Sequence, residues 1–103
     1  MYSVYKYEIT DSSSGVYMPE GASVLKIGAQ YEKICVWALV DLNTLKGPEI
    51  KRNFKAFGTG HPIKEVENLV YYDTVMLAGG QLVFHIFEEV YSKEQRQLGR
   101  LKL

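Results

Sequence analysis

The stretch Ile34-Cys35-Val36-Trp37-Ala38-Leu39-Val40 decides the fold, because every one of its positions is apolar. A strand that is apolar on both faces leaves no side for water, so we expect it to cross the middle of the hydrophobic core with Trp37 inside. Cys35 is expected to be a buried structural thiol. Because it is the single cysteine of the chain, no internal disulfide can form and no oxidising compartment is implied.

Short apolar or alternating runs continue on both sides of this stretch, separated by Gly, Pro, Asn, Asp and Ser, a pattern typical of strands and turns. We expect further strands near residues 2–10, 16–18, 23–29, 50–56, 69–77 and 81–87. The turns fall near residues 30–33 and at the Gly79-Gly80 pair, whereas residues 63–68 form a loop or one helical turn. The sequence thus predicts a mainly β, single-domain protein over residues 1–103.

We expect six or seven strands in an antiparallel sheet, curled into a small barrel or folded as a small sandwich. Residues 92–103 are rich in Lys and Arg and predict a short C-terminal tail that is helical, frayed or dependent on a partner. The expected core consists of Leu25, Ile27, Val36, Trp37, Leu39, Phe54, Val75, Leu77, Leu82, Phe84 and Ile86.

Charge and hydropathy limit the partners of the chain. Twelve Lys and Arg balance twelve Asp and Glu, which argues against a general nucleic-acid binder and against a protein that coats an anionic membrane. No apolar run approaches the roughly 20 residues that span a bilayer, and no leader peptide is recognisable. We therefore expect a cytoplasmic protein that recognises any charged ligand locally.

The best candidate for a binding site is the glycine-rich segment at residues 57–62. Lys51, Arg52 and Lys55 precede it on one predicted strand, and glycines around a threonine can expose successive backbone N–H groups to an anion. The alternative is that the glycines only permit positive φ angles at a strand end. Neither nucleotide-binding glycine fingerprint is present. The predicted ligand-binding residues are Arg52, Lys55, Phe57, Gly58, Thr59, Gly60 and His61.

The two histidines have different expected roles. His61 either presents its imidazole to a ligand or caps the turn by bonding a neighbouring carbonyl. His85 stands in an apolar run and predicts a core histidine whose nitrogens are satisfied by the backbone or a tyrosine. No spacing of nucleophile and base points to catalysis, and no Cys/His set points to a metal. We therefore predict no catalytic residues, no metal and no cofactor.

Four blocks of the sequence resemble those of a family of short, uncharacterised bacteriophage and prophage proteins. They are Met-Pro-Glu-Gly-Ala at 18–22, Trp-Ala-Leu-Val-Asp at 37–41, Phe-Gly-Thr-Gly-His-Pro at 57–62 and Gly-Gly-Gln-Leu-Val-Phe-His-Ile-Phe at 79–87. The resemblance extends over residues 5–89, departs at residues 42–47 and after residue 89, and brings no established activity. It implies a phage origin, and hence action in the cytoplasm of a bacterial host.

A phage protein without catalytic residues acts by binding. Our leading hypothesis is a non-enzymatic, homo-oligomeric binding protein that sequesters an anionic, nucleotide-type host signal near residues 57–62. The alternative is an interaction module that inhibits or redirects a host protein through an exposed sheet edge or its basic tail. A hydrolase comes third, because it would need His61 or His85 beside a carboxylate in an open pocket.

Overall fold

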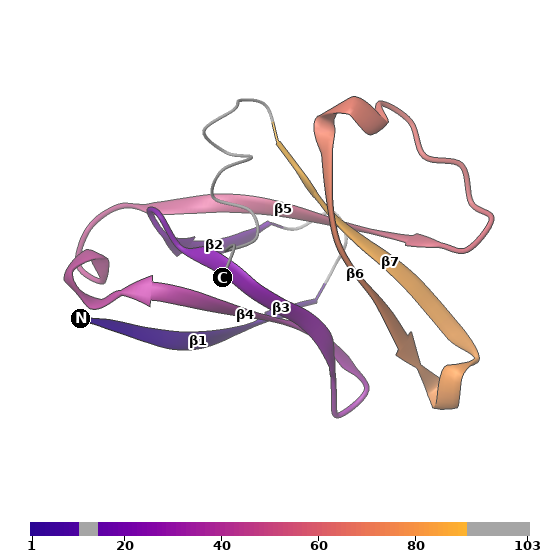
Figure 1. Ribbon diagram of the computed structural model, residues 1–103, viewed down its shortest axis with the longest axis horizontal. Helices are drawn as coiled ribbons and strands as arrows, with labels where there is room; N and C mark the ends of the chain where they lie inside the picture. Colours follow the sequence, from indigo (N-terminus) through magenta and orange to yellow (C-terminus); the bar gives the residue numbers. More distant parts are fainter. Residues whose placement is uncertain (11–14, 91–103) are drawn as a thin grey trace.

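The computed structural model describes residues 1–10 and 15–90, and it places seven strands in two antiparallel sheets (Figure 1). The first sheet has the order β1-β4-β3, formed by β1 (Tyr2–Ile9), β4 (Lys33–Asp41) and β3 (Ser23–Gln30). The second has the order β2-β5-β7-β6, formed by β2 (Val16–Pro19), β5 (Glu49–Gly58), β7 (Leu82–Glu89) and β6 (Leu69–Leu77). The prediction of a mainly β fold with six or seven antiparallel strands is confirmed.

Short turns complete the described part of the chain. The 3₁₀ turns η1 (Leu42–Thr44), η2 (Val66–Asn68) and η3 (Ala78–Gly80) are the helical elements within the described residues, and no helix there is long and apolar enough to cross a membrane. The expected hairpins at residues 30–33 and at Gly79-Gly80 are both present. The predicted tail at residues 92–103 lies outside the described residues.

One core lies between the two sheets. Ile27, Val36, Phe54, Val75 and Ile86 are buried as predicted, and Leu77 and Phe84 pack partly buried against them. Cys35 is also buried, as expected. The alternation of β4 points Val36, Ala38 and Val40 inward, so Trp37 and Leu39 point outward and are only half-buried. The predictions that Trp37 and Leu39 belong to the core were therefore wrong.

Two bulges shift the core residues of the edge strands. In β3 the register slips between Val24 and Lys26, which leaves Leu25 without a cross-strand partner and turns both Val24 and Ile27 toward the core. Leu25, a predicted core residue, is consequently only half-buried. In β6 the register slips between Tyr71 and Asp73, and the extra residue, Tyr72, is 1% exposed.

Leu82 was also predicted to lie in the core, and it is 49% exposed. It begins β7 directly after the glycine turn, where it is paired with Leu77 at the outer end of the sheet. Leu82 lies on the same face of β7 as the buried Ile86, but a residue at the end of a strand has too few neighbours to be enclosed.

Candidate functional site

The glycine-rich segment at residues 57–62 is a tight turn at the end of β5. The His61 N–H donates to the Gly58 carbonyl at 3.1 Å, and Gly60 takes a φ of +86°, which glycine adopts without strain. Because this bond uses the His61 N–H, that group cannot contribute to a cradle of free N–H donors. Gly60 and the exposed Thr59 form the tip of the turn.

His61 lies directly over the turn. A Cβ built on Gly58 would stand 2.9 Å from the imidazole Cε1 and 3.0 Å from Nδ1, closer than packed atoms come. Gly58 is therefore required for close approach rather than for a positive φ. The imidazole is exposed on its other side, so His61 both covers the turn and faces solvent.

Arg52 is the predicted ligand residue that the structure separates from the turn. It is 6% exposed on the inner face of β5, where Nε donates to Glu88 Oε2 and Nη2 to Glu88 Oε1, both at 2.7 Å. Nη1 donates to the Ala22 carbonyl at 2.6 Å, and Tyr72 Oη donates to Glu88 Oε1 at 2.6 Å. A guanidinium enclosed in this way supports the core, which corrects its assignment to the binding site.

This buried cluster has shifted ionisation equilibria. Burial alone would lower the pKa of Arg52, but the hydrogen bonds and negative charge of Glu88 outweigh it and raise that pKa above its ordinary value. Burial, then the charge and hydrogen bond of Glu88, raise the pKa of the Tyr72 phenol far above its ordinary value. At neutral pH the cluster therefore holds a protonated Arg52 and a neutral Tyr72.

The outer face of the second sheet brings together residues from the two longest of the four sequence blocks, at residues 57–62 and 79–87. Phe57 on β5 is paired with His85 on β7. Phe57 packs edge-on against Phe87 with ring centroids 5.6 Å apart, and Phe87 packs edge-on against Tyr71 of β6 at 5.3 Å. Three neighbouring strands thus present a row of aromatic rings on the face opposite the core.

A chain of hydrogen bonds runs beside this aromatic row. Thr59 Oγ1 lies 2.7 Å from His85 Nε2, and His85 Nδ1 lies 3.0 Å from Thr74 Oγ1. Thr74 Oγ1 in turn lies 2.6 Å from Tyr71 Oη. His85 is therefore half-buried on the outer face with both nitrogens satisfied by threonine hydroxyls, not by backbone or tyrosine as predicted. Neutral imidazole donates at one of its nitrogens and accepts at the other, so the chain has a direction.

A cleft opens between this face and the loop that follows the turn. Its volume is about 340 Å³, within the usual range for small-molecule sites. It contains the predicted residues Lys55 and Phe57, whereas Gly58, Thr59, Gly60 and His61 lie beside it in the turn. The sequence analysis missed its other walls, although Pro62 belongs to the glycine-rich block. The cleft is lined by Lys55, Phe57, Pro62, Lys64, Glu65, Leu69 and Glu89.

The charges of this cleft are mixed. Lys55 Nζ lies 3.5 Å from Glu89 Oε2, whereas Lys64 forms no ion pair within residues 1–10 and 15–90. With Glu65 and Glu89 on the walls, the cleft suits a ligand that carries both an anionic group and hydrogen-bond donors. In the same described ranges, no group of three or more His, Cys, Asp or Glu side chains is arranged to hold a metal ion.

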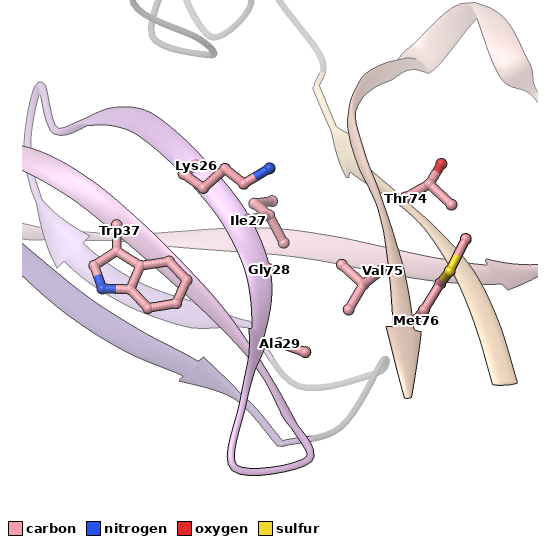
Figure 2. Close-up of a pocket in the computed structure, with 8 residues that line it drawn as sticks. All are labelled: Lys26, Ile27, Gly28, Ala29, Trp37, Thr74, Val75 and Met76. Carbon is pink, nitrogen blue, oxygen red and sulfur yellow. The ribbon is translucent and has the colours of Figure 1, made fainter. Parts of the chain in front are cut away.

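A second, larger groove of about 660 Å³ separates the two sheets where β3 faces β6. Figure 2 shows Ile27 and Ala29 of β3 on the side that faces Val75 of β6, with Met76 extending from the other side of β6. Trp37, the only tryptophan of the chain, lines the groove beside Gly28, where an added Cβ would stand in ordinary contact with the indole at 3.8 Å. The groove is mostly apolar and open, as in surfaces that accept a protein segment.

Residues 1–97 match the family described as a domain of unknown function, DUF7352. The chain belongs to this family. No curated protein and no solved structure shows significant similarity to it. The DUF7352 match covers both blocks that meet on the outer face of the second sheet, and its description assigns them no activity.

Proposed function

We propose that this DUF7352 chain is a non-enzymatic binding protein that holds a small nucleotide-type molecule in the cleft beside residues 57–62. The observation that carries the proposal is the combination, in one cleft, of an aromatic wall at Phe57 with the ammonium group of Lys64, which has no ion-pair partner among the described residues. A planar base can pack on the ring, and a phosphate can bind the ammonium group. The carboxylates of Glu65 and Glu89 can accept hydrogen bonds from base or sugar donors.

The biological role follows from the expected phage origin. A phage protein with this site would withdraw a nucleotide-type signal from the cytoplasm of its bacterial host, and withdrawal needs tight binding but no chemistry. Lys55 remains a proposed ligand residue, although a ligand would compete with Glu89 for it. The turn at 58–61 supports the cleft, with Thr59 held by His85.

The test is a thermal-shift panel of mononucleotides, cyclic nucleotides and ADP-ribose compounds, followed by calorimetric titration of each compound that binds. A ligand that binds only the folded state raises the melting temperature with its concentration. Lys64→Ala is expected to weaken binding about tenfold or more through loss of a charged hydrogen bond. Lys46→Ala is the matched control, because Lys46 is an exposed lysine outside the cleft.

Phe57→Leu distinguishes stacking of a base on the Phe57 ring from simple apolar contact, because leucine keeps apolar volume but has no aromatic face. The proposal is wrong if no compound of the panel shifts the melting temperature. It is equally wrong if Lys64→Ala and Lys46→Ala bind a positive compound with the same affinity.

A second candidate function is an interaction module for a host protein, favoured by the groove between β3 and β6. Met76 is 62% exposed on its rim, and Trp37 makes occupancy measurable as a change in tryptophan emission. We expect a host partner to be captured by the wild-type chain and lost with Met76→Glu. Leu82→Glu is the control, because Leu82 is 49% exposed and does not line the groove. Equal capture by both variants would exclude the groove.

A further inference from the structure

The two sheets have four edge strands, and three of them are protected against pairing with another chain. β3 and β6 each contain a bulge and face each other across the groove. Lys26 and Asp73 join them at 2.8 Å, and Glu32 Oε2 accepts from the Ala78 N–H at 2.7 Å further along. β2 has only four residues and ends in proline at Pro19. Bulges, covering contacts, short length and proline are the usual protections of sheet edges.

Among the residues that the structure describes, the fourth edge, β1, has none of these four protections. It pairs with β4 over eight residues without a register shift and contains no proline. Tyr2 and Val4 are 62% and 52% exposed, and no other described strand pairs with β1. Figure 1 shows β1 along the lower border of the molecule, with β4 on one side only. A long and regular edge of this kind, with exposed apolar side chains beside Lys6 and Glu8, is a template for a further strand.

The backbone groups available at this edge can be identified. The Leu42 N–H donates to the Met1 carbonyl at 2.9 Å, so Met1 and Leu42 form the hydrogen-bonded pair next to the opposed residues Tyr2 and Asp41. Hydrogen-bonded pairs alternate along an antiparallel ladder, so the odd-numbered residues of β1 bond to β4. The N–H and C=O groups of the even-numbered residues, Val4 and Lys6 among them, therefore point toward the free edge.

We propose that a second copy of the chain pairs antiparallel with β1 about a twofold axis at Tyr7, joining two three-stranded sheets into one of six strands. The charges of β1 select this register. Lys6 and Glu8 lie on the same face, and a twofold axis at Tyr7 places each Lys6 opposite the partner's Glu8. An axis at Lys6 would instead place the two lysines opposite each other. The edge is thus complementary to itself.

The same register matches the remaining side chains. Tyr5 is placed opposite the partner's Ile9 on the inner face, and Val4 opposite the partner's Thr10 on the outer face. Aromatic and β-branched pairs of this kind stabilise antiparallel strands. The contacts that Lys6 and Glu8 make within the chain can be exchanged cheaply, because the bonds to Gln30 at 2.7 Å and Lys33 at 3.8 Å are formed by exposed side chains.

The test is the mass of the full-length protein in solution, measured by sedimentation equilibrium over a concentration series. We expect the wild-type chain to form a dimer. Lys6→Glu and Glu8→Lys each create two like-charge pairs across the axis and are expected to raise the dimer dissociation constant about tenfold or more. An equimolar mixture of the two variants is expected to recover the dimer, because every opposing pair then again joins an acid and a base.

Val4→Pro provides a second, independent variant. Its lost N–H points to the free edge, so the substitution blocks pairing between copies while the ladder to β4 keeps its bonds. Lys46→Glu is the control for charge reversal away from β1. Each variant's melting curve must remain cooperative. A monomeric wild-type chain overturns the proposal, and so does a dimer that is unchanged by Val4→Pro or that the mixture of charge variants fails to restore.

Discussion

Arg52 and Glu88 form a bidentate ion pair inside the core, with both N–O distances at 2.7 Å and side chains 6% and 5% exposed. The pair joins β5 to β7, and the bond from Arg52 to the Ala22 carbonyl extends the connection toward the first sheet. Two charges removed from water are stable together only while each satisfies the other. This explains how a basic residue fits within an otherwise apolar inner face.

We expect Glu88→Gln to destabilise the protein by about 3 kcal/mol or more, because it leaves the Arg52 charge buried without a counter-charge. The combined substitution Arg52→Met and Glu88→Leu should recover most of this loss, since it removes both charges and keeps apolar volume. Urea denaturation of the single and double variants measures the coupling. Additive effects of the two sites would contradict the interpretation.

Stability should fall at alkaline pH. Burial raises the pKa of Tyr72, and burial together with the charge of Glu49 raises the pKa of Tyr7. The folded state therefore keeps phenol protons that the unfolded chain loses above about pH 10, so this contribution is complete below about pH 10 and declines above it. Tyr72, whose pKa is displaced far, contributes a slope of up to about 1.4 kcal/mol per pH unit, and the partly exposed Tyr7 contributes less.

Tyr72→Phe removes one of these two contributions and should flatten the decline, measured as the free energy of unfolding at a series of pH values. Tyr31→Phe is the matched control, because the Tyr31 side chain is 87% exposed at the hairpin tip. A slope that does not differ between Tyr72→Phe and wild type would show that Tyr72 does not carry the effect.

Gly58→Ala should destabilise the turn, because the new methyl group would stand 2.9 Å from the His61 ring. We expect a cost of about 1 kcal/mol, since the exposed imidazole can move away from the turn. In a His61→Ala background the same substitution should cost less than half as much. Thermal unfolding of the four proteins gives this coupling, and the NMR signals of the His61 ring report its displacement. Equal costs in both backgrounds would refute the contact.

The hydrogen-bond chain at His85 predicts unequal effects of its two threonines. Thr59→Val removes one bond, to Nε2, whereas Thr74→Val removes the bonds to Nδ1 and to Tyr71. We expect losses of about 1 kcal/mol and about 2 kcal/mol respectively. The nitrogen chemical shifts of His85 should also show a changed tautomer balance. Tyr31→Phe, which removes one hydroxyl at an exposed hairpin tip, is the control.

The strands were largely predictable because side chains alternate with a period of two, and this pattern is local. The turn at Gly79-Gly80 followed from residue types that permit it, whereas Tyr31 and Glu32 in the turn at residues 30–33 take positive φ angles that their residue types do not indicate. The bulges in β3 and β6 were not predictable. An extra residue reverses which side chains face the core, and so Val24 replaced Leu25 inside. Trp37 was misplaced because a strand that is apolar on both faces does not reveal which face is inner.

The candidate site was only partly predictable for a related reason. The glycine-rich block identified Phe57 and the turn, and Lys55 was found on the same strand. The partners of the turn come from elsewhere in the chain: Thr59 bonds His85, which lies 26 residues away. Arg52 was grouped with Lys55 on charge, although an odd separation along a strand places them on opposite faces.

Local residue patterns thus determined the β class, the approximate strands and the glycine turn of this DUF7352 chain. Strand register and packing decided the burial of Arg52 against Glu88, the row of rings beside His85, and the free edge of β1. These features depend on which distant residues become neighbours. The strand pairing that makes these residues neighbours is the one that gives the complete core its lowest free energy. No short stretch of sequence determines that free energy by itself.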